Sequence, residues 1–195
     1  DPAPGVPGAT AGWVGKPQID DSGAVAFEGF LTGSGINGSN DLILWYGQPG
    51  ALEVVAREGS QVPGLPVGGV YDDWEVTYTM GSDGTFAIGA ILIGPGVVPG
   101  VNDKALLIGR VGLLQPVIRA GDQAPLLPPG VVISPEGTFF AEFADDGRYM
   151  PAFLLTGPGI DGTNDVVFYA VDAGVWHHLA RTGDQAPGCP PGVKF

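Results

Sequence analysis

The chain repeats itself three times with a period of 62 residues, and this period constrains the fold more strongly than any local pattern. A fixed period of this length is typical of arrays in which each repeat forms one small unit and packs against its neighbours. The residues that mark the period are Arg57, Arg119 and Arg181, with the Asn-Asp pairs that begin at Asn40, Asn102 and Asn164. The period predicts a single array over residues 1–195, with repeats at about 9–64, 65–126 and 127–188.

The most similar part of each repeat is an ungapped block of 11 residues, introduced by a short acidic turn that contains glycine. Aspartate and glycine are the residues expected at the tip of a hairpin, and the block that follows is mostly apolar, as a strand would be. The three copies are GAVAFEGFLTG (23–33), GTFAIGAILIG (84–94) and GRYMPAFLLTG (147–157).

Four strands are predicted in every repeat. In the first repeat they lie at 13–19, 23–33, 42–46 and 52–57. The counterparts of the first strand lie at 74–80 and 138–143. The 34 glycines and 19 prolines disfavour long helices. We therefore expect an all-β fold of three tandem four-stranded antiparallel units that resemble the blades of a β-propeller.

The third strand of the first repeat, LILWY at 42–46, is apolar on both faces. This pattern is expected when each blade packs between two neighbours. Propellers usually close with at least four blades, and the sequence provides three.

The two ends of the chain look like overlapping halves of one motif. DPAPGVPG at 1–8 resembles DQAPGCPPG at 184–192, and residues 189–195 resemble the start of another repeat. Three interpretations are open: the ends pair within the molecule and close a small ring, the ends of different subunits join head to tail into a filament, or the chain is part of a longer array.

One family resemblance rests on the stretch Asp20-Asp21-Ser22-Gly23-Ala24-Val25-Ala26-Phe27, followed by LTG and by AREG with a downstream Pro-Gly. These residues resemble bacterial tandem-repeat proteins described by an NxxGxxAF motif. Asp20 stands where that motif has Asn, and the later copies have Ala87-Ile88 and Met150-Pro151 in place of Ala-Phe. The resemblance implies an exported, often surface-anchored protein with propeller-like repeats and no catalytic residues.

The charge of the chain limits its partners. With 21 acidic and 8 basic residues the net charge is −13, which repels the phosphates of nucleic acid and suits divalent cations or simply a soluble surface. No apolar stretch reaches about 18 residues, so we expect no membrane span. Cys189 is the only cysteine, which excludes an internal disulfide. We interpret the chain, which starts at Asp1, as mature and exported, extracellular or at the cell surface.

The polar loop before the third strand is the candidate metal site. Ca²⁺ takes six to eight oxygen ligands, and glycine lets backbone carbonyls turn inward. The second copy has Val98 where the others have Asn37 or Asp161, so we expect it to bind more weakly. The alternative is an Asx turn that only redirects the chain. The candidate Ca²⁺ ligands are Asn37, Asn40, Asp41, Asn102, Asp103, Asp161, Asn164 and Asp165.

Other repeated or polar residues give weaker hypotheses. The acidic turns carry further carboxylates, and the repeated arginines fit a strand-end ion pair, a bridge to the next blade or a lectin-like ligand site. Tryptophans can stack on sugar rings, although Trp45 lies in an apolar strand and is expected in the core. These residues are Asp20, Asp21, Asp83, Asp145 and Asp146 in the turns, and Trp13, Trp45, Trp74 and Trp176.

His177 and His178 occur in one repeat only, and their side chains should point to opposite faces of a strand. No nucleophile motif accompanies them, so we predict that the protein is not an enzyme. The sequence favours an extracellular structural or adhesive protein that assembles with itself head to tail, stabilised by Ca²⁺. The alternative is a lectin-like module whose partners are glycans.

Overall fold

The structure, a computed structural model, describes the backbone of residues 1–195 and all side chains except those of residues 74–77. Its thirteen named elements are all β-strands, which confirms the prediction of an all-β fold. Among the described residues there is no helix with the length and apolar character needed to cross a membrane.

The strands form three antiparallel sheets that follow one another along the chain. The first sheet contains β1 (Ala9–Ile19), β2 (Val25–Gly33), β3 (Leu42–Gln48) and β4 (Ala51–Arg57) in that order. The second contains β5 (Val70–Met80), β6 (Phe86–Ile93), β7 (Lys104–Gly109) and β8 (Gln115–Arg119). The third contains β10 (Phe140–Phe143), β11 (Tyr149–Thr156), β12 (Val166–Asp172) and β13 (Val175–Arg181), with β9 (Val132–Ile133) paired to the end of β11.

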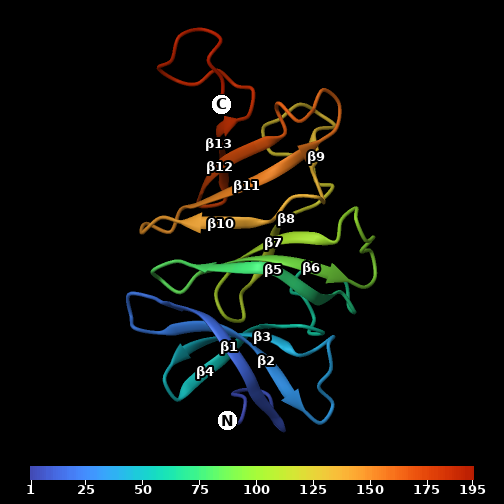
Figure 1. The fold of residues 1–195 in the computed structure, drawn as a ribbon, viewed down its shortest axis with the longest axis vertical. Helices are drawn as coiled ribbons and strands as arrows, with labels where there is room; N and C mark the ends of the chain where they lie inside the picture. Colours follow the sequence, from blue (N-terminus) through green and yellow to red (C-terminus); the bar gives the residue numbers. More distant parts are fainter.

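The sheets are stacked along the long axis of the molecule, with the N-terminus beyond the first sheet and the C-terminus beyond the third (Figure 1). They do not close into a barrel or a propeller ring, and the chain ends are not paired with each other. The interpretation of a small ring closed within the molecule is therefore wrong for this structure. The comparison of each sheet with a propeller blade stays a prediction.

Hydrophobic cores lie between successive sheets. One core combines Leu44, Ala56 and Val62 with Phe86 and Leu107 of the second sheet, all of them buried. A second core joins the second and third sheets in the same way, through Leu106, Ile118, Ala124, Ile133, Phe139 and Tyr169. Each of these two cores is therefore shared by two sheets, and neither sheet completes it alone.

The backbones of neighbouring sheets also come close. The Tyr78 hydroxyl on β5 donates a hydrogen bond to the Lys16 carbonyl on β1, and the Thr79 hydroxyl donates to the Ala141 carbonyl on β10. A Cβ at Gly89 would lie 1.9 Å from the Phe139 carbonyl oxygen, so only glycine permits this approach. The contact is part of the packing between the second and third sheets.

β3 is buried on both faces, as the sequence predicts. Leu44 faces the core shared with the second sheet, while Ile43 and Trp45 face a smaller core covered by the N-terminal loop. The prediction that Trp45 lies in the core is confirmed, because none of its surface is exposed.

The first strands differ from the sequence prediction. β1 starts at Ala9 and not near 13, and β5 starts at Val70 and not near 74. In the third sheet the strand is divided into β9 and β10. In the first sheet Ala9–Ala11 pair with the end of β2, and a bulge separates them from the rest of β1. The bulge interrupts the regular alternation of side chains along β1, so the sequence does not read as one continuous strand.

Candidate functional site

The candidate calcium loop of the first repeat is organised by its own amide side chains. Asn37 Oδ1 accepts hydrogen bonds from the Ser39 backbone N–H at 3.0 Å and from the Ser39 hydroxyl at 2.7 Å. Asn40 Oδ1 accepts from the Asn37 N–H at 2.9 Å, and Asn40 Nδ2 donates to the Gly35 carbonyl at 3.0 Å. This is the geometry of Asx turns, in which a short side chain replaces a backbone partner.

The third copy repeats these contacts. Asp161 Oδ1 accepts from the Thr163 N–H and hydroxyl, and Asn164 bridges the Asp161 N–H and the Gly159 carbonyl. The two hydrogen bonds from Thr163 lower the pKa of the Asp161 carboxyl. The first and third loops are thus equivalent in the structure, as their sequences suggest.

The second copy differs, as expected from Val98. Asn102 still bridges the Val98 N–H and the Gly96 carbonyl, but here the Gly100 N–H donates to Asp103 Oδ2. The other carboxylate oxygen, Asp103 Oδ1, is buried without a hydrogen-bond partner. The carboxylate therefore points into the loop rather than to solvent in this copy.

Asp41 and Asp165 lie where each loop enters the third strand. The Asp41 carbonyl accepts from the Leu31 N–H at 2.7 Å, and the Asp165 carbonyl accepts from the Leu155 N–H at 2.7 Å. In the first repeat the buried Glu58 reaches the same place, where its carboxylate accepts from the N–H groups of Asp41 and Leu42. Burial raises the pKa of Glu58, and the neighbouring Asp41 carboxyl adds to the increase.

Many of the side-chain oxygen atoms in these loops accept hydrogen bonds from the loops' own N–H and hydroxyl groups. No group of three or more His, Cys, Asp or Glu side chains suited to a metal ion occurs among the side chains that the structure describes. An amide oxygen has two lone pairs, and Asn40 Oδ1 accepts one hydrogen bond, from the Asn37 N–H, so it can still accept a further partner. Calcium binding by these loops stays a prediction.

Two of the three repeated arginines donate hydrogen bonds to the Asn-Asp loops. Arg57 Nε donates to the Asn40 carbonyl at 2.9 Å, and an Arg119 guanidinium N–H donates to the Asn102 carbonyl at 2.5 Å. Arg181 instead lies 3.9 Å from Asp184 in an ion pair. Two of the three arginines therefore bind backbone within their own repeat, which differs from the expected ion pair or bridge to the next blade.

The acidic turns are closed by local partners. Asp20 accepts from the Ser22 N–H and hydroxyl and from the Ala24 N–H, and its second oxygen accepts from the Tyr46 hydroxyl. Burial opposes ionisation of Asp20, but the Tyr46 and Ser22 hydrogen bonds outweigh it and lower the pKa of this carboxyl. The same bond to Asp20 raises the pKa of Tyr46 to about 12.

In the remaining acidic turns two of the carboxylates also have a nearby partner, in each case an arginine. Asp83 lies 2.5 Å from a guanidinium nitrogen of Arg110, and Asp146 lies 2.6 Å from one of Arg148. Asp21 and Asp145 are exposed. These contacts describe structural turns and do not bring the five carboxylates to one place.

The tryptophans do not form equivalent surface platforms. Trp13 is exposed beside Phe30, whereas Trp45 is buried and Trp176 is half-buried against Tyr169. The side chain of Trp74 lies outside the described residues. Binding of glycans to the tryptophans or arginines stays a prediction.

His177 and His178 are both exposed on β13. They pair with different residues of β12, Ala170 and Tyr169 respectively, and only the His178 ring lies against Tyr169, with ring centroids 6.0 Å apart. Cys189 is a free, exposed thiol in the C-terminal loop.

The strongest unassigned feature is an apolar surface that faces away from the stack. We call it the outer face; it consists of Met150, Phe168, Ala170 and Leu179 of the third sheet and Val193 and Phe195 of the C-terminal loop. Phe168 is 38% exposed, while Leu44 and Leu106, which precede it by two periods and one period, are both 0% exposed. The same sheet position is thus covered in the first two sheets and open in the third.

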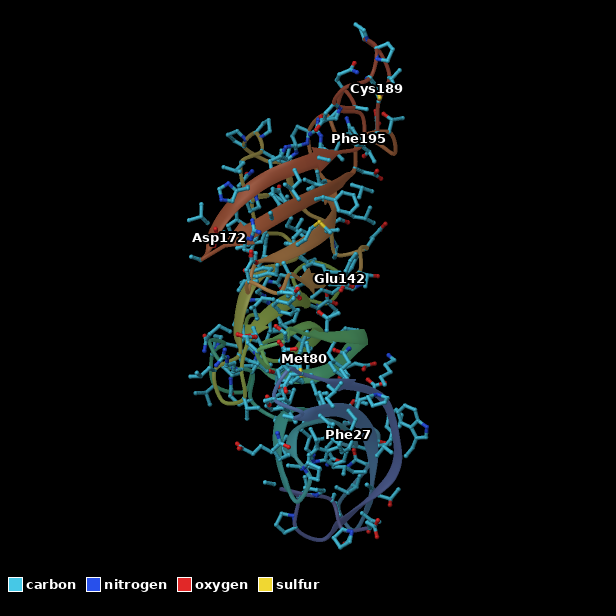
Figure 2. All side chains as sticks on the ribbon, turned by 90° about the vertical axis from the view of Figure 1, so that its left-hand side faces the viewer. Phe27, Met80, Glu142, Asp172, Cys189 and Phe195 are labelled. Atoms are coloured by element: carbon cyan, nitrogen blue, oxygen red, sulfur yellow. The ribbon has the colours of Figure 1, made fainter. Side chains whose placement is uncertain are left out.

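The C-terminal loop shows the same contrast. Phe195 is 56% exposed, while its counterparts Tyr71 and Ile133 are 3% and 0% exposed. Figure 2 shows Phe195 and Cys189 at the far end of the molecule, beyond the third sheet. An apolar depression of about 280 Å³ lies on the outer face, lined in part by Met150, Ala170 and Leu179.

Sequence analysis did not identify the outer face, although the signal was present. Aligning Phe168 with Leu44 and Leu106 by the 62-residue period places a large apolar side chain at a position that is buried whenever another sheet follows. The open sheet is therefore recognised by comparison between repeats and not by any motif.

Comparison with known proteins gives one match. No curated protein and no solved structure matches the chain. Residues 1–133 match the model of DUF7453, a family of unknown function. Because this match covers more than half of the 195 residues, the chain belongs to the DUF7453 family.

Proposed function

We propose that this protein is a non-catalytic structural or adhesive building block that assembles head to tail, with the outer face of one copy packed on the first sheet of a second copy. The observation that carries the proposal is the exposure of Phe168 at a position where Leu44 and Leu106 are buried by the next sheet. Each internal core is completed by a following sheet, so a sheet of the same kind is the partner whose shape fits the outer face.

A head-to-tail junction is also consistent with the shape of the molecule. The N-terminus and the C-terminus lie at opposite ends of the stack, so copies joined end to end continue the same axis (Figure 1). Such a contact uses two different surfaces, and it gives an open filament when the rotation between successive copies does not close a ring. In such a filament each sheet acts as one repeat unit of a linear array.

The proposed location is extracellular or at the cell surface, as the resemblance to NxxGxxAF-type repeat proteins implies. Calcium is the ion we propose for the loops at 35–41 and 159–165, because the chain is strongly acidic and an amide or carboxylate oxygen in each loop retains acceptor capacity. Chelation should then loosen the assembly.

The proposal is tested by sedimentation velocity over a range of protein concentrations, with Phe168→Asp as the decisive variant. Wild-type protein is expected to associate progressively, and Phe168→Asp is expected to weaken association at least tenfold, because it places a charge in the proposed junction. Because Phe168 is already 38% exposed in the single chain, the variant should lower the melting temperature less than a substitution at the fully buried Leu106 does.

Two matched variants separate assembly from folding and from net charge. Val67→Asp adds the same charge at a 93% exposed site away from the outer face and should associate like the wild type. Leu106→Ala changes the equivalent buried position and should cost about 2–5 kcal/mol of stability. A wild type that stays monomeric contradicts the proposal, and so does equal weakening by Val67→Asp; a monomer retained on glycans would favour the lectin-like alternative.

A further inference from the structure

The chain contains four loops of one kind but only three sheets on which such loops can pack. Four loops share one conformation, in which a residue of the loop forms an isolated antiparallel bridge to a residue eight or nine positions later. The bridges are Pro2 with Thr10, Gln61 with Val70, Gln123 with Val132, and Gln185 with Lys194. We call these segments, 1–11, 59–71, 121–133 and 183–195, the linking loops.

Each of the first three linking loops lies on the sheet that follows it in sequence. The Pro4 carbonyl accepts a hydrogen bond from Trp45 Nε1 at 2.9 Å, and the Pro125 carbonyl accepts one from the Tyr169 hydroxyl at 2.7 Å. Trp45 and Tyr169 occupy the same position of their sheets, two periods apart. The surface around Trp45 is the loop site of the first sheet.

A second contact places the N-terminal loop at that same position. A Cβ on Gly5 would meet Val54 at 2.9 Å, and a Cβ on the equivalent Gly64 would meet Pro116 at 3.2 Å, one period after Val54. The N-terminal loop therefore fills on the first sheet the place that the loop of the preceding sheet fills on the second.

The fourth linking loop has no sheet beneath it. Val6, Leu65 and Leu127 pack against the cores, whereas the equivalent Cys189 is exposed. Figure 2 shows this loop, with Cys189, projecting from the end of the molecule. If a second copy stacks on the outer face, residues 183–195 and the second copy's own residues 1–11 compete for one loop site.

The two competitors are not equally well organised. Gln185 Nε2 donates to the carbonyls of Ala186, Cys189 and Pro190, and Gln185 Oε1 accepts from the Gly192 N–H at 2.8 Å. The N-terminal loop has Pro2 at that position and lacks these side-chain contacts. A loop held in its bound conformation binds at lower entropic cost, so the C-terminal loop is favoured.

The start of β1, residues 9–11, can also detach from the sheet independently of the rest of the strand. A register shift between Ala11 and Trp13 separates Ala9–Ala11 from the rest of β1. In the third sheet the equivalent segment, β9, is a separate strand from β10. Loss of residues 9–11 from the pairing therefore need not move the strand from Trp13 onward.

We infer that assembly exchanges loops: residues 183–195 of one copy displace residues 1–11 from the loop site of the next copy. This inference rests on the proposed head-to-tail function and names the segment that makes the junction. In the exchanged junction Phe195 takes the place of Ala11, and Cys189 lies beneath the sheet where Val6 lay.

A reversible lock on the N-terminal loop tests the exchange. Thr10 and Thr32 are directly paired across β1 and β2 and both are exposed, a spacing that suits a cross-strand disulfide. The variant is Thr10→Cys/Thr32→Cys in a Cys189→Val background, which keeps an apolar side chain in the C-terminal loop. The matched control is Gln48→Cys/Ala51→Cys in the same background, at an exposed pair of β3 and β4.

The expected result is that the oxidised Thr10–Thr32 lock stays monomeric, that reductant restores wild-type association, and that the control associates in both states. Equal association of the oxidised and reduced lock overturns the exchange while leaving stacking intact. Loss of association in the oxidised control as well also overturns it. Absence of association in every protein overturns the proposed function itself.

Hydrogen exchange in the wild type gives an independent sign. The Ala3 N–H donates to the Ala9 carbonyl at 3.0 Å in the single chain. Loop exchange should speed hydrogen exchange at residues 3–9 on assembly and should slow modification of Cys189 by a thiol reagent at least tenfold. Slower hydrogen exchange at residues 3–9 on assembly would overturn the inference.

Discussion

Leu126 has a left-handed backbone conformation, and the three equivalent positions in the other linking loops are all glycine. Its φ is +62°, and the equivalent residues Gly5, Gly64 and Gly188 have φ values of +73°, +81° and +75°. An L side chain in this left-handed region places its Cβ close to the following carbonyl oxygen. Leu126→Gly should therefore relieve strain in the linking loop between the second and third sheets.

The size of the effect follows from two opposing terms. Relief of the left-handed conformation is worth about 1–2 kcal/mol, and the greater freedom of glycine in the unfolded chain costs about 0.5–1 kcal/mol. Leu126 is 68% exposed, so little apolar burial is lost. We expect a net stabilisation of about 0.5 kcal/mol, or a rise of about 1–2 °C in melting temperature for a chain of this size.

Urea unfolding and thermal melting measure this difference. Leu126→Ala is the control, because it shortens the side chain and keeps the strain, so it should not stabilise. Gly188→Leu introduces the strain in the C-terminal loop and should destabilise that loop locally. A Leu126→Gly variant less stable than the wild type by more than about 0.5 kcal/mol would refute the argument, because it would mean that contacts of Leu126 outweigh the strain.

Three further predictions concern the polar contacts. Glu58→Gln should stabilise the protein increasingly as the pH rises from 4 to 7.5, as measured by urea unfolding. The folded-state pKa of Glu58 is raised above its ordinary value of 4.5, so the stability that Glu58 contributes is full below pH 4.5 and is lost as the pH rises through the folded-state pKa. A difference in unfolding free energy between variant and wild type that does not change with pH would contradict this. Tyr46→Phe should lower the free energy of unfolding by about 1–2 kcal/mol at pH 7, and this loss should shrink as the pH falls through the lowered pKa of Asp20. A loss of stability that does not change with pH would contradict this prediction. Calcium should raise the melting temperature of the wild type, and Asp41→Asn with Asp165→Asn should reduce that rise more than Asp103→Asn does; equal reduction by Asp103→Asn would count against the difference between the loops.

Much of the fold could be predicted because the repeats are compared with one another. Burial of β3 on both faces followed from the apolar run at 42–46, since alternate side chains of a strand point to opposite sides. The division of the first strand into β9 and β10 could not be predicted from that pattern. The spacing between the second and third repeats changes from 62 at Val70 and Val132 to 63 at Met80 and Phe143, and Pro135 within the added stretch cannot donate to a ladder.

The candidate site was only partly predictable. The Asn-Asp loops lie directly before β3, β7 and β12, but whether an amide oxygen faces a cation or a neighbouring N–H depends on loop backbone geometry that spacing does not encode. Arg57 was expected to pair with charge or with the next unit, and it instead donates to the Asn40 carbonyl. The linking loops were visible as repeated Gln and Pro residues, yet the contrast between the first three, which lie on sheets, and the fourth, which does not, required the structure.

Electron microscopy of the unmodified chain at increasing concentration is the direct test of head-to-tail stacking. We expect unbranched filaments one molecule wide, in which sheets follow one another along the filament axis as they do within a single chain, and we expect these filaments to be lost in Phe168→Asp. Isolated three-sheet particles at all concentrations, or filaments that persist in Phe168→Asp, would contradict it.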